Sequence, residues 1–176
     1  MTRKQIVENL KRGHLVHESL RTGLDVTWRE SIDNESARAL AGALFERGDA
    51  TANVLAHFLP QLRDKGGWGE VIRAAVDRVS GADSVDQWFL SNRATAKLLL
   101  QHASTVSTAC QERLQRRVAG LLTEHRSGNL QQALELLKSA PALSPEVRQE
   151  LEELAKANAE PQGMLAKELL AKPLLS

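Results

Sequence analysis

Five histidines and one cysteine are the side chains of this 176-residue chain best suited to bind a metal or attack a substrate. His14 and His17 lie three residues apart in a stretch of helical periodicity, so both could reach one metal ion. No second cluster supplies further ligands, and both histidines continue an apolar stripe. A partly buried or interfacial histidine pair is therefore favoured, and no metal site is predicted.

Cys110 lies between Val106 and Leu114 on a predicted packing stripe, as is typical of a small core residue. A nucleophilic role needs a base beside the thiolate, and spacing alone places neither His102 nor His125 there. The sequence also lacks a Gly-x-Ser-x-Gly elbow, a phosphate-binding loop and a dinucleotide fingerprint. We therefore expect a protein that is not an enzyme and needs no cofactor.

Arg113, Arg116 and Arg117 lie at positions i, i+3 and i+4, which share one face of a helix. Each could neutralise a phosphate of a nucleic acid. The alternative is a solvated face on which Glu112 pairs with Arg116. This alternative is favoured, because the net charge of the chain is only +1. Only 3% of the residues are aromatic, so the chain also lacks aromatic side chains on which nucleic-acid bases could stack.

Helices must position all of these residues, because apolar residues recur with helical period and no stretch alternates as a strand does. The predicted fold class is all-α: a compact helical bundle followed by a helical extension. The helices are expected over residues 3–24 (which Gly13 can split), 35–47, 50–64 (with a kink or early end at Pro60), 68–79, 84–101, 104–126, 129–139, 145–158 and 161–172.

Capping residues predict several of the helix ends. Asp33 or Asn34 can accept hydrogen bonds at the start of 35–47, and Asp49 is expected to cap the next helix. Ser84 and Gln87 have the spacing of a capping box. Ser144 before Pro145 combines a cap with proline at the first helical position.

The composition changes near residue 90, since every aspartate, tryptophan and phenylalanine precedes it. The remainder consists mainly of leucine, alanine, glutamine, glutamate and arginine. The sequence therefore predicts an N-terminal helical bundle over residues 1–100 and a C-terminal helical extension over residues 101–176.

Residues 48–80 combine a leucine-rich helix with a helix that opens on a tryptophan. Leu55, Leu59 and Leu62 precede the turn at Gly67, and Trp68 begins the next helix. This pattern resembles the death-fold superfamily, most closely the caspase-recruitment domains of cytosolic viral-RNA sensors and their mitochondrial adaptor, and also the bacterial effector-associated domains. Ala75-Val76 departs from the family's Ala-Leu pair. Over residues 1–100 the resemblance implies a six-helix bundle that binds similar domains without catalysis.

The resemblance also implies that partners pair through surface patches of opposite charge. Candidate residues for this surface are Arg63, Lys65, Glu70, Arg73 and Asp77, which carry both signs. An ordinary solvated face of mixed charge is the alternative.

An α-solenoid of helix pairs is the alternative architecture. The expected pairs begin at residues 35, 68, 104 and 145, intervals close to those of helical repeats. This architecture would suit a scaffold that binds a protein or a peptide.

The function predicted from the sequence is a non-catalytic, intracellular protein–protein interaction module for an adaptor or an oligomer. A helical-repeat scaffold and a nucleic-acid-associated protein are the alternatives. The expected partner is a protein or a second copy of the chain. No apolar run reaches the ~20 residues of a membrane span. Met1–Gln5 has no signal-peptide core, and one cysteine suits a reducing compartment, so we expect a cytoplasmic location and no membrane partner.

Overall fold

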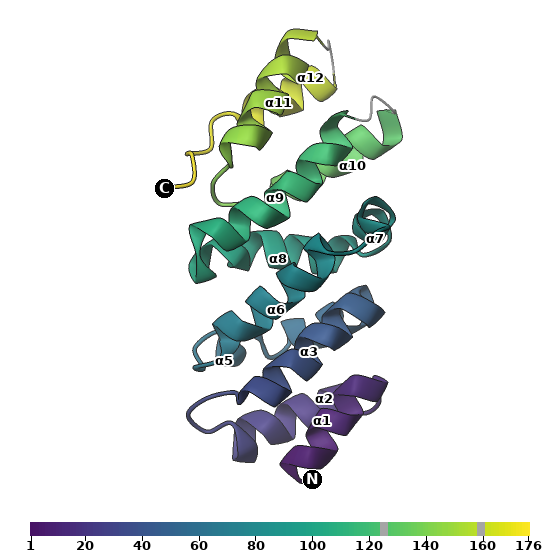
Figure 1. Cartoon of the computed structure of the whole chain (residues 1–176), viewed down its shortest axis with the longest axis vertical. Helices are drawn as coiled ribbons and strands as arrows, with labels where there is room; N and C mark the ends of the chain where they lie inside the picture. Colours follow the sequence, from purple (N-terminus) through teal and green to yellow (C-terminus); the bar gives the residue numbers. More distant parts are fainter. Residues whose placement is uncertain (124–126, 158–160) are drawn as a thin grey trace. The chain divides into compact units, whose positions relative to one another are not determined.

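A computed structural model describes residues 1–123, 127–157 and 161–176 of the chain (Figure 1). These residues contain helices and two isolated β-bridges but no strand, so the all-α fold class is confirmed. They form two compact units, Met1–Val79 and Ser80–Ser176. The division into a bundle of residues 1–100 and an extension of residues 101–176 stays a prediction about which pieces fold independently.

The first unit contains six α-helices and one π-helical segment. These are α1 (Arg3–Arg12), α2 (Val16–Thr22), η1 (Gly23–Thr27), α3 (Asn34–Arg47), α4 (Asp49–Ala56), α5 (Leu59–Leu62) and α6 (Trp68–Ser80). The break at Pro60 is confirmed: α4 ends at Ala56, and Pro60 lies in the first turn of α5, where its missing N–H costs nothing.

Gly13 splits the first amphipathic stretch into α1 and α2. It takes φ +68°, a left-handed conformation that glycine adopts without steric cost, and its N–H closes the end of α1 on the Asn9 and Leu10 carbonyls. His14 therefore lies in the link before α2, whereas His17 lies within α2. The prediction that His14 and His17 share one helix is wrong, because the chain leaves the helical path between them.

Asp33 is the N-cap of α3, as predicted. Its carboxylate accepts hydrogen bonds from the Ser36 backbone N–H at 3.1 Å and from the Ser36 hydroxyl at 2.7 Å. Two other predicted caps are wrong. Asp49 is the first helical residue of α4, behind Gly48 at the N-cap, and Ser84 makes no side-chain capping bond.

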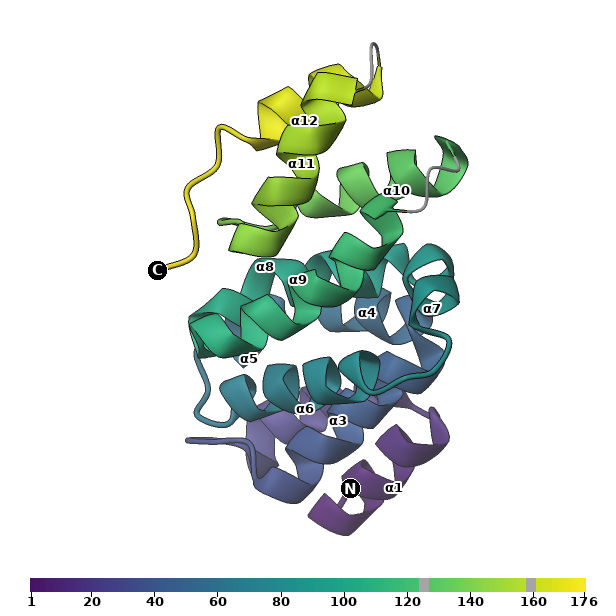
Figure 2. The same ribbon diagram turned by 45° about the horizontal axis from the view of Figure 1, so that its top comes forward.

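Helix pairs stack within the first unit, with α1 against α3 and α2 against α4. Figure 2 shows α3 between α1 and α6. Arg78 of α6 reaches α3, where its guanidinium lies 3.2 Å from the Glu46 carboxylate and 5.4 Å from the Phe45 ring centroid. α3 is therefore flanked by helices on two sides.

Two tryptophans hold the non-helical links of the first unit. Trp28 is fully buried at the end of η1, and Trp68 is 5% exposed at the start of α6. The segments that contain them meet where the Ile32 N–H donates to the Gly66 carbonyl at 2.7 Å. The following Gly67 has φ +88°, and a Cβ there would lie 2.2 Å from the Ile32 carbonyl oxygen, so this position requires glycine.

The second unit contains α7 (Val85–Ser91), α8 (Arg93–Val106), α9 (Thr108–Thr123), α10 (Ser127–Leu137), α11 (Pro145–Ala157) and α12 (Gln162–Leu169). The predicted helix 84–101 is wrong, because Asn92 has non-helical φ and ψ and separates α7 from α8. The predicted start of the next helix is also too early, since α8 continues to Val106.

The helices of the second unit stack as two layers. Contacts join α7 to α9 and α9 to α11, and separately join α8 to α10 and α10 to α12. Stacked neighbours of this kind are typical of helical-repeat proteins. The core is built mainly from leucine and alanine, as the composition predicts, with the fully buried Phe89 on α7.

A buried glutamine fixes the link before α11. The side-chain amide of Gln115, on α9, donates to the Ala142 carbonyl at 2.8 Å and accepts from the Ser144 N–H at 2.6 Å. The Ser144 hydroxyl accepts from the Val147 N–H at 3.2 Å, which confirms the predicted cap before Pro145.

Candidate protein-interaction site

A groove runs along the outer face of α3. This α3 groove has a volume of about 540 Å³. Its floor consists of Ala39, Gly42 and Ala43, which lie at i, i+3 and i+4 and are all buried. Lys11 of α1 and Arg78 of α6 lie on its rim. Small floor residues leave space for another chain to approach the helix closely.

The rim of the α3 groove carries both charges, and its carboxylates are already engaged. Glu46 pairs with Arg78 at 3.2 Å, and Glu35 lies 3.9 Å from Arg3. Arg38 lines the same groove and is exposed, and it has no ion-pair partner in residues 1–123, 127–157 and 161–176. The groove therefore presents one guanidinium that is available to a ligand.

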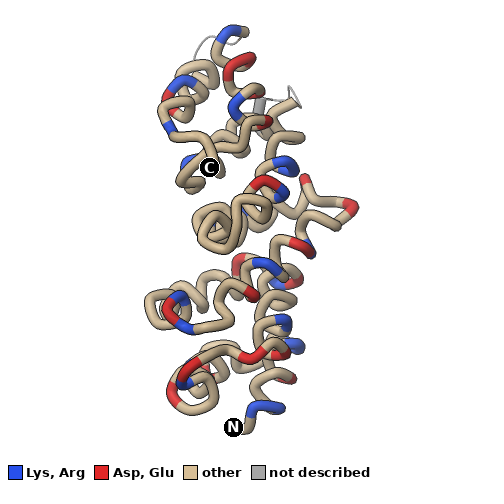
Figure 3. The backbone as a smooth tube through the Cα atoms, turned by 60° about the vertical axis from the view of Figure 1, so that its left-hand side comes forward, with Lys and Arg blue, Asp and Glu red and all other residues tan. Residues whose placement is uncertain are grey.

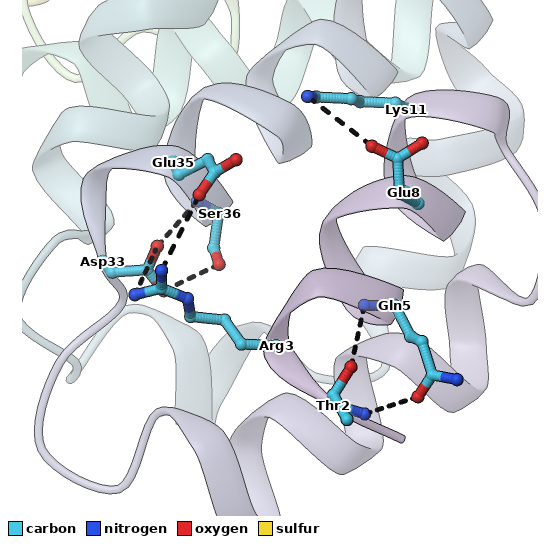
Figure 4. Close-up of polar contacts among 8 residues, drawn as sticks. All are labelled: Thr2, Arg3, Gln5, Glu8, Lys11, Asp33, Glu35 and Ser36. Atoms are coloured by element: carbon cyan, nitrogen blue, oxygen red, sulfur yellow. Dashed lines mark hydrogen bonds and ion pairs between the residues drawn. The ribbon is translucent and has the colours of Figure 1, made fainter.

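The Asp33 carboxylate anchors the start of α3 beside this groove (Figure 4). Burial raises the pKa of Asp33, but the hydrogen bonds from Ser36 and the positive charge of Arg3 lower it more, so the pKa lies below its ordinary value. An Arg3 guanidinium nitrogen is 4.0 Å from the Asp33 carboxylate. Asp33 is therefore ionised at neutral pH and holds the first turn of α3 in place.

The interaction surface predicted from the sequence lies on α6 and on the link before it. Arg63, Arg73 and Asp77 are exposed there, whereas Lys65 and Glu70 are half-buried. Lys65 donates to the Arg29 backbone carbonyl, and Glu70 pairs with Arg73 at 3.1 Å. Glu70, Arg73 and Asp77 share one face of α6. Lys65 serves a link within the unit, so its ammonium is less available to a partner.

The predicted basic face lies on α9. Arg116 pairs with Glu146 of α11 at 3.2 Å, and Arg117 is half-buried with its guanidinium on the Ala82 carbonyl at 3.0 Å. Arg113 is exposed. Figure 3 shows acidic residues interspersed with basic ones along the second unit, to which α9 belongs. Arg116 and Arg117 therefore have intramolecular partners that would compete with a phosphate, and Arg116 pairs with Glu146 instead of the expected Glu112.

Two further cavities meet on α9, at Arg116 and Gly120. One, of about 490 Å³, reaches α7 and is lined by Asp83 and Asp86. The other, of about 280 Å³, reaches α11 and is lined by Glu150. A Cβ added at Gly120 would meet no atom of the described residues within 4 Å, so this surface is open.

Cys110 and the histidines considered as reactive groups do not form a cluster for catalysis in the described ranges. Cys110 and His102 are buried, and the Cys110 N–H donates to the Ser107 hydroxyl at the start of α9. His125 falls outside the described residues. No group of three or more His, Cys, Asp or Glu residues in those ranges is placed to hold a metal ion. Among the same residues, no helix is both long and apolar enough to cross a bilayer.

The α3 groove was not predicted from the sequence. The helical pattern assigned α3 a single apolar face through Leu40 and Leu44, yet Ala39 and Ala43 on the neighbouring face are buried too. The signal was the i, i+3, i+4 spacing of Ala39, Gly42 and Ala43. This spacing forms the floor of a groove only because α1 and α6 flank α3, and the sequence does not give the positions of those helices.

Comparisons with known proteins leave the family open. No protein-family model, no curated protein and no solved structure matches the chain.

Proposed function

We propose that this chain is a non-catalytic scaffold that binds a segment of a partner protein in the α3 groove. The observation that carries the proposal is the composition of the groove: a buried floor of small residues, a charged rim, and Arg38, which has no ion pair within the described part of the chain. An apolar floor inside a polar rim is the usual anatomy of a protein interface.

The dimensions of the groove suit a short peptide segment. Its lining extends from Asn34 to Glu46, and at 1.5 Å per residue this length of helix is about 18 Å. An extended segment of roughly five or six residues covers that distance. Arginine is enriched among residues that dominate binding energy, because its planar guanidinium binds carboxylates in pairs of hydrogen bonds. Arg38 is therefore the proposed anchor for a carboxylate of the partner.

The stacking of helix pairs within each unit supports the scaffold interpretation. Helical-repeat proteins use such stacks as binding surfaces, and they need no catalytic residues. This favours the helical-repeat alternative over a nucleic-acid-associated protein, since Arg116 and Arg117 already have protein partners.

Site-specific photo-crosslinking tests the proposal. A photoreactive residue at Asn34 reports on the α3 groove, and one at Gln149 reports on the cavity between α9 and α11. Both positions are exposed amide residues that line a cavity. We expect a discrete crosslinked partner from Asn34 alone, and purified partner should bind an Arg38→Glu variant at least about tenfold more weakly. Crosslinking from Gln149 alone would contradict the proposal.

Self-association through α6 is the second candidate function. It is favoured by the exposed, oppositely charged Arg73 and Asp77 on one face of α6, as the death-fold resemblance implies. Sedimentation of the full chain over a range of concentration and salt tests it. A monomer at every concentration would remove this candidate and leave the α3 groove unaffected.

A further inference from the structure

Two histidines, one in α2 and one at the end of α4, lie close together on the surface of the first unit. His17 lies in α2, and His57 is the residue that ends α4. Their ring centroids are 6.5 Å apart, with an angle of 65° between the ring planes, and both side chains are exposed. The His17 ring also contacts the half-buried Phe58 ring, at 4.9 Å between centroids. The His17 side chain therefore packs against Phe58 and is still exposed to solvent.

This distance is close to the separation of two imidazoles that share a metal ion. Metal–nitrogen bonds of about 2 Å place the ring centroids of two such ligands roughly 5–6 Å apart. Both side chains are exposed, so the two rings have room to change rotamer toward one another. Neutral imidazole suits Zn²⁺, Cu²⁺ and Ni²⁺, whereas Mg²⁺ and Ca²⁺ prefer oxygen ligands.

We propose that His17 and His57 form a two-histidine site for a divalent transition-metal ion of the imidazole-binding class. The two residues supply two ligands, and no third His, Cys, Asp or Glu of the described chain joins them, so water completes the coordination shell. The bound ion would link α2 to the end of α4. Because the unfolded chain does not hold these rings together, binding would favour the folded first unit.

His14 provides a matched control for the proposal. It is exposed like His17 and His57, but it lies in the link before α2 and has no ring contact with either of them in the described structure. A site formed by chance from any exposed histidine would depend on His14 as much as on the other two. The proposed site depends on His17 and His57 only.

Calorimetric titration of the full, metal-stripped chain with Zn²⁺ and Ni²⁺ tests the inference. We expect one ion per chain and no binding of Mg²⁺, with affinity lowered about tenfold or more in both His17→Gln and His57→Gln and unchanged in His14→Gln. NMR should show the imidazole resonances of His17 and His57 shifting together on addition of Zn²⁺. Unfolding midpoints without metal should match in all three variants, because the substituted rings are exposed.

Several results would overturn the inference. These are no Zn²⁺ or Ni²⁺ binding, equal binding of Mg²⁺, or an affinity that falls in His14→Gln and not in His57→Gln. Each outcome is independent of whether a partner binds in the α3 groove.

Discussion

The two compact units stabilise their non-helical links in different ways. In Met1–Val79 the links lie beside large aromatic residues, with Trp28 fully buried after η1 and Trp68 buried at the start of α6. In Ser80–Ser176 the link before α11 is held by hydrogen bonds from the Gln115 side chain to backbone groups. The links of the first unit are stabilised by buried apolar surface, whereas the link before α11 is stabilised by hydrogen bonds to buried backbone groups. Substitutions in the two units should therefore lower the free energy of unfolding for different reasons.

The two units also differ in the surroundings of the glycine that lines a surface cavity in each of them. Gly42 lies on the floor of the α3 groove, where an added Cβ would approach the Arg78 guanidinium at 3.2 Å. Gly120 lies where two cavities meet on α9, and an added Cβ would touch none of the described atoms within 4 Å. Glycine therefore lies close to a side chain of a neighbouring helix in one unit and on an open surface in the other.

The largest expected effect is that of Trp28→Ala in the first unit. Truncation of this fully buried side chain should cost about 3–5 kcal/mol of unfolding free energy, because it removes apolar contacts and leaves a cavity. Denaturant unfolding followed by circular dichroism measures it. Val26→Ala is the control, since Val26 is 59% exposed two residues away. Equal losses in the two variants would mean that Trp28 does not anchor this link.

Gln115→Leu should be the most informative change in the second unit. It leaves the Ala142 carbonyl and the Ser144 N–H without their partner, at a cost of about 1–3 kcal/mol. Gln111→Leu is the matched control four residues earlier on α9. Gln111 is equally buried, but among the described residues its side chain makes one hydrogen bond, to the Leu100 carbonyl, and its side-chain oxygen has no partner there. Denaturant unfolding should show a greater loss of unfolding free energy for Gln115→Leu than for Gln111→Leu. The reverse order would refute the proposed role of the Gln115 amide.

Asp33→Asn should cost about 0.3–1 kcal/mol at neutral pH, because it removes the negative charge at the start of α3 while the amide oxygen can still cap the helix. The lowered pKa of Asp33 means that its ionised form stabilises the fold above the unfolded-state pKa of about 4. That stability is lost as the pH falls through the folded-state pKa. The difference between parent and variant should therefore shrink below about pH 4 in unfolding experiments at several pH values. Ser84→Ala should show little effect at any pH, because Ser84 makes no side-chain capping bond.

The smallest expected effect on stability is that of Arg63→Glu and Arg73→Glu. Both arginines are exposed, and exposed ion pairs contribute about 0–1 kcal/mol. If α6 mediates self-association, these changes should weaken it in sedimentation experiments while the thermal midpoint stays nearly constant. A large fall in the midpoint would show that the two arginines serve the fold instead.

The sequence predicted the helices better than it predicted where each helix ends and which helices pack against it. The apolar periodicity identified the buried face of α6, and Ser144 with Pro145 located the start of α11. Asp49 was wrong as a cap because Gly48 is the N-cap of α4, and Ser84 is the N-cap of α7 but makes no side-chain capping bond. Local sequence does not determine whether a side chain at a helix start reaches the free backbone N–H groups. The His17–His57 contact and the α3 groove depend on packing between helices that are distant in the sequence. Periodicity carries no information about such packing.

The central claim is that a partner binds in the groove along α3, and affinity measurements on two glycine variants test it most directly. With the partner identified by crosslinking, its affinity for Gly42→Leu and Gly120→Leu forms of the full chain is compared with the parent. Leucine at position 42 fills the floor of the groove, whereas leucine at position 120 extends into open space. We predict at least about tenfold weaker binding for Gly42→Leu and parental affinity for Gly120→Leu. Parental affinity for Gly42→Leu, in a variant that unfolds like the parent, would contradict the claim.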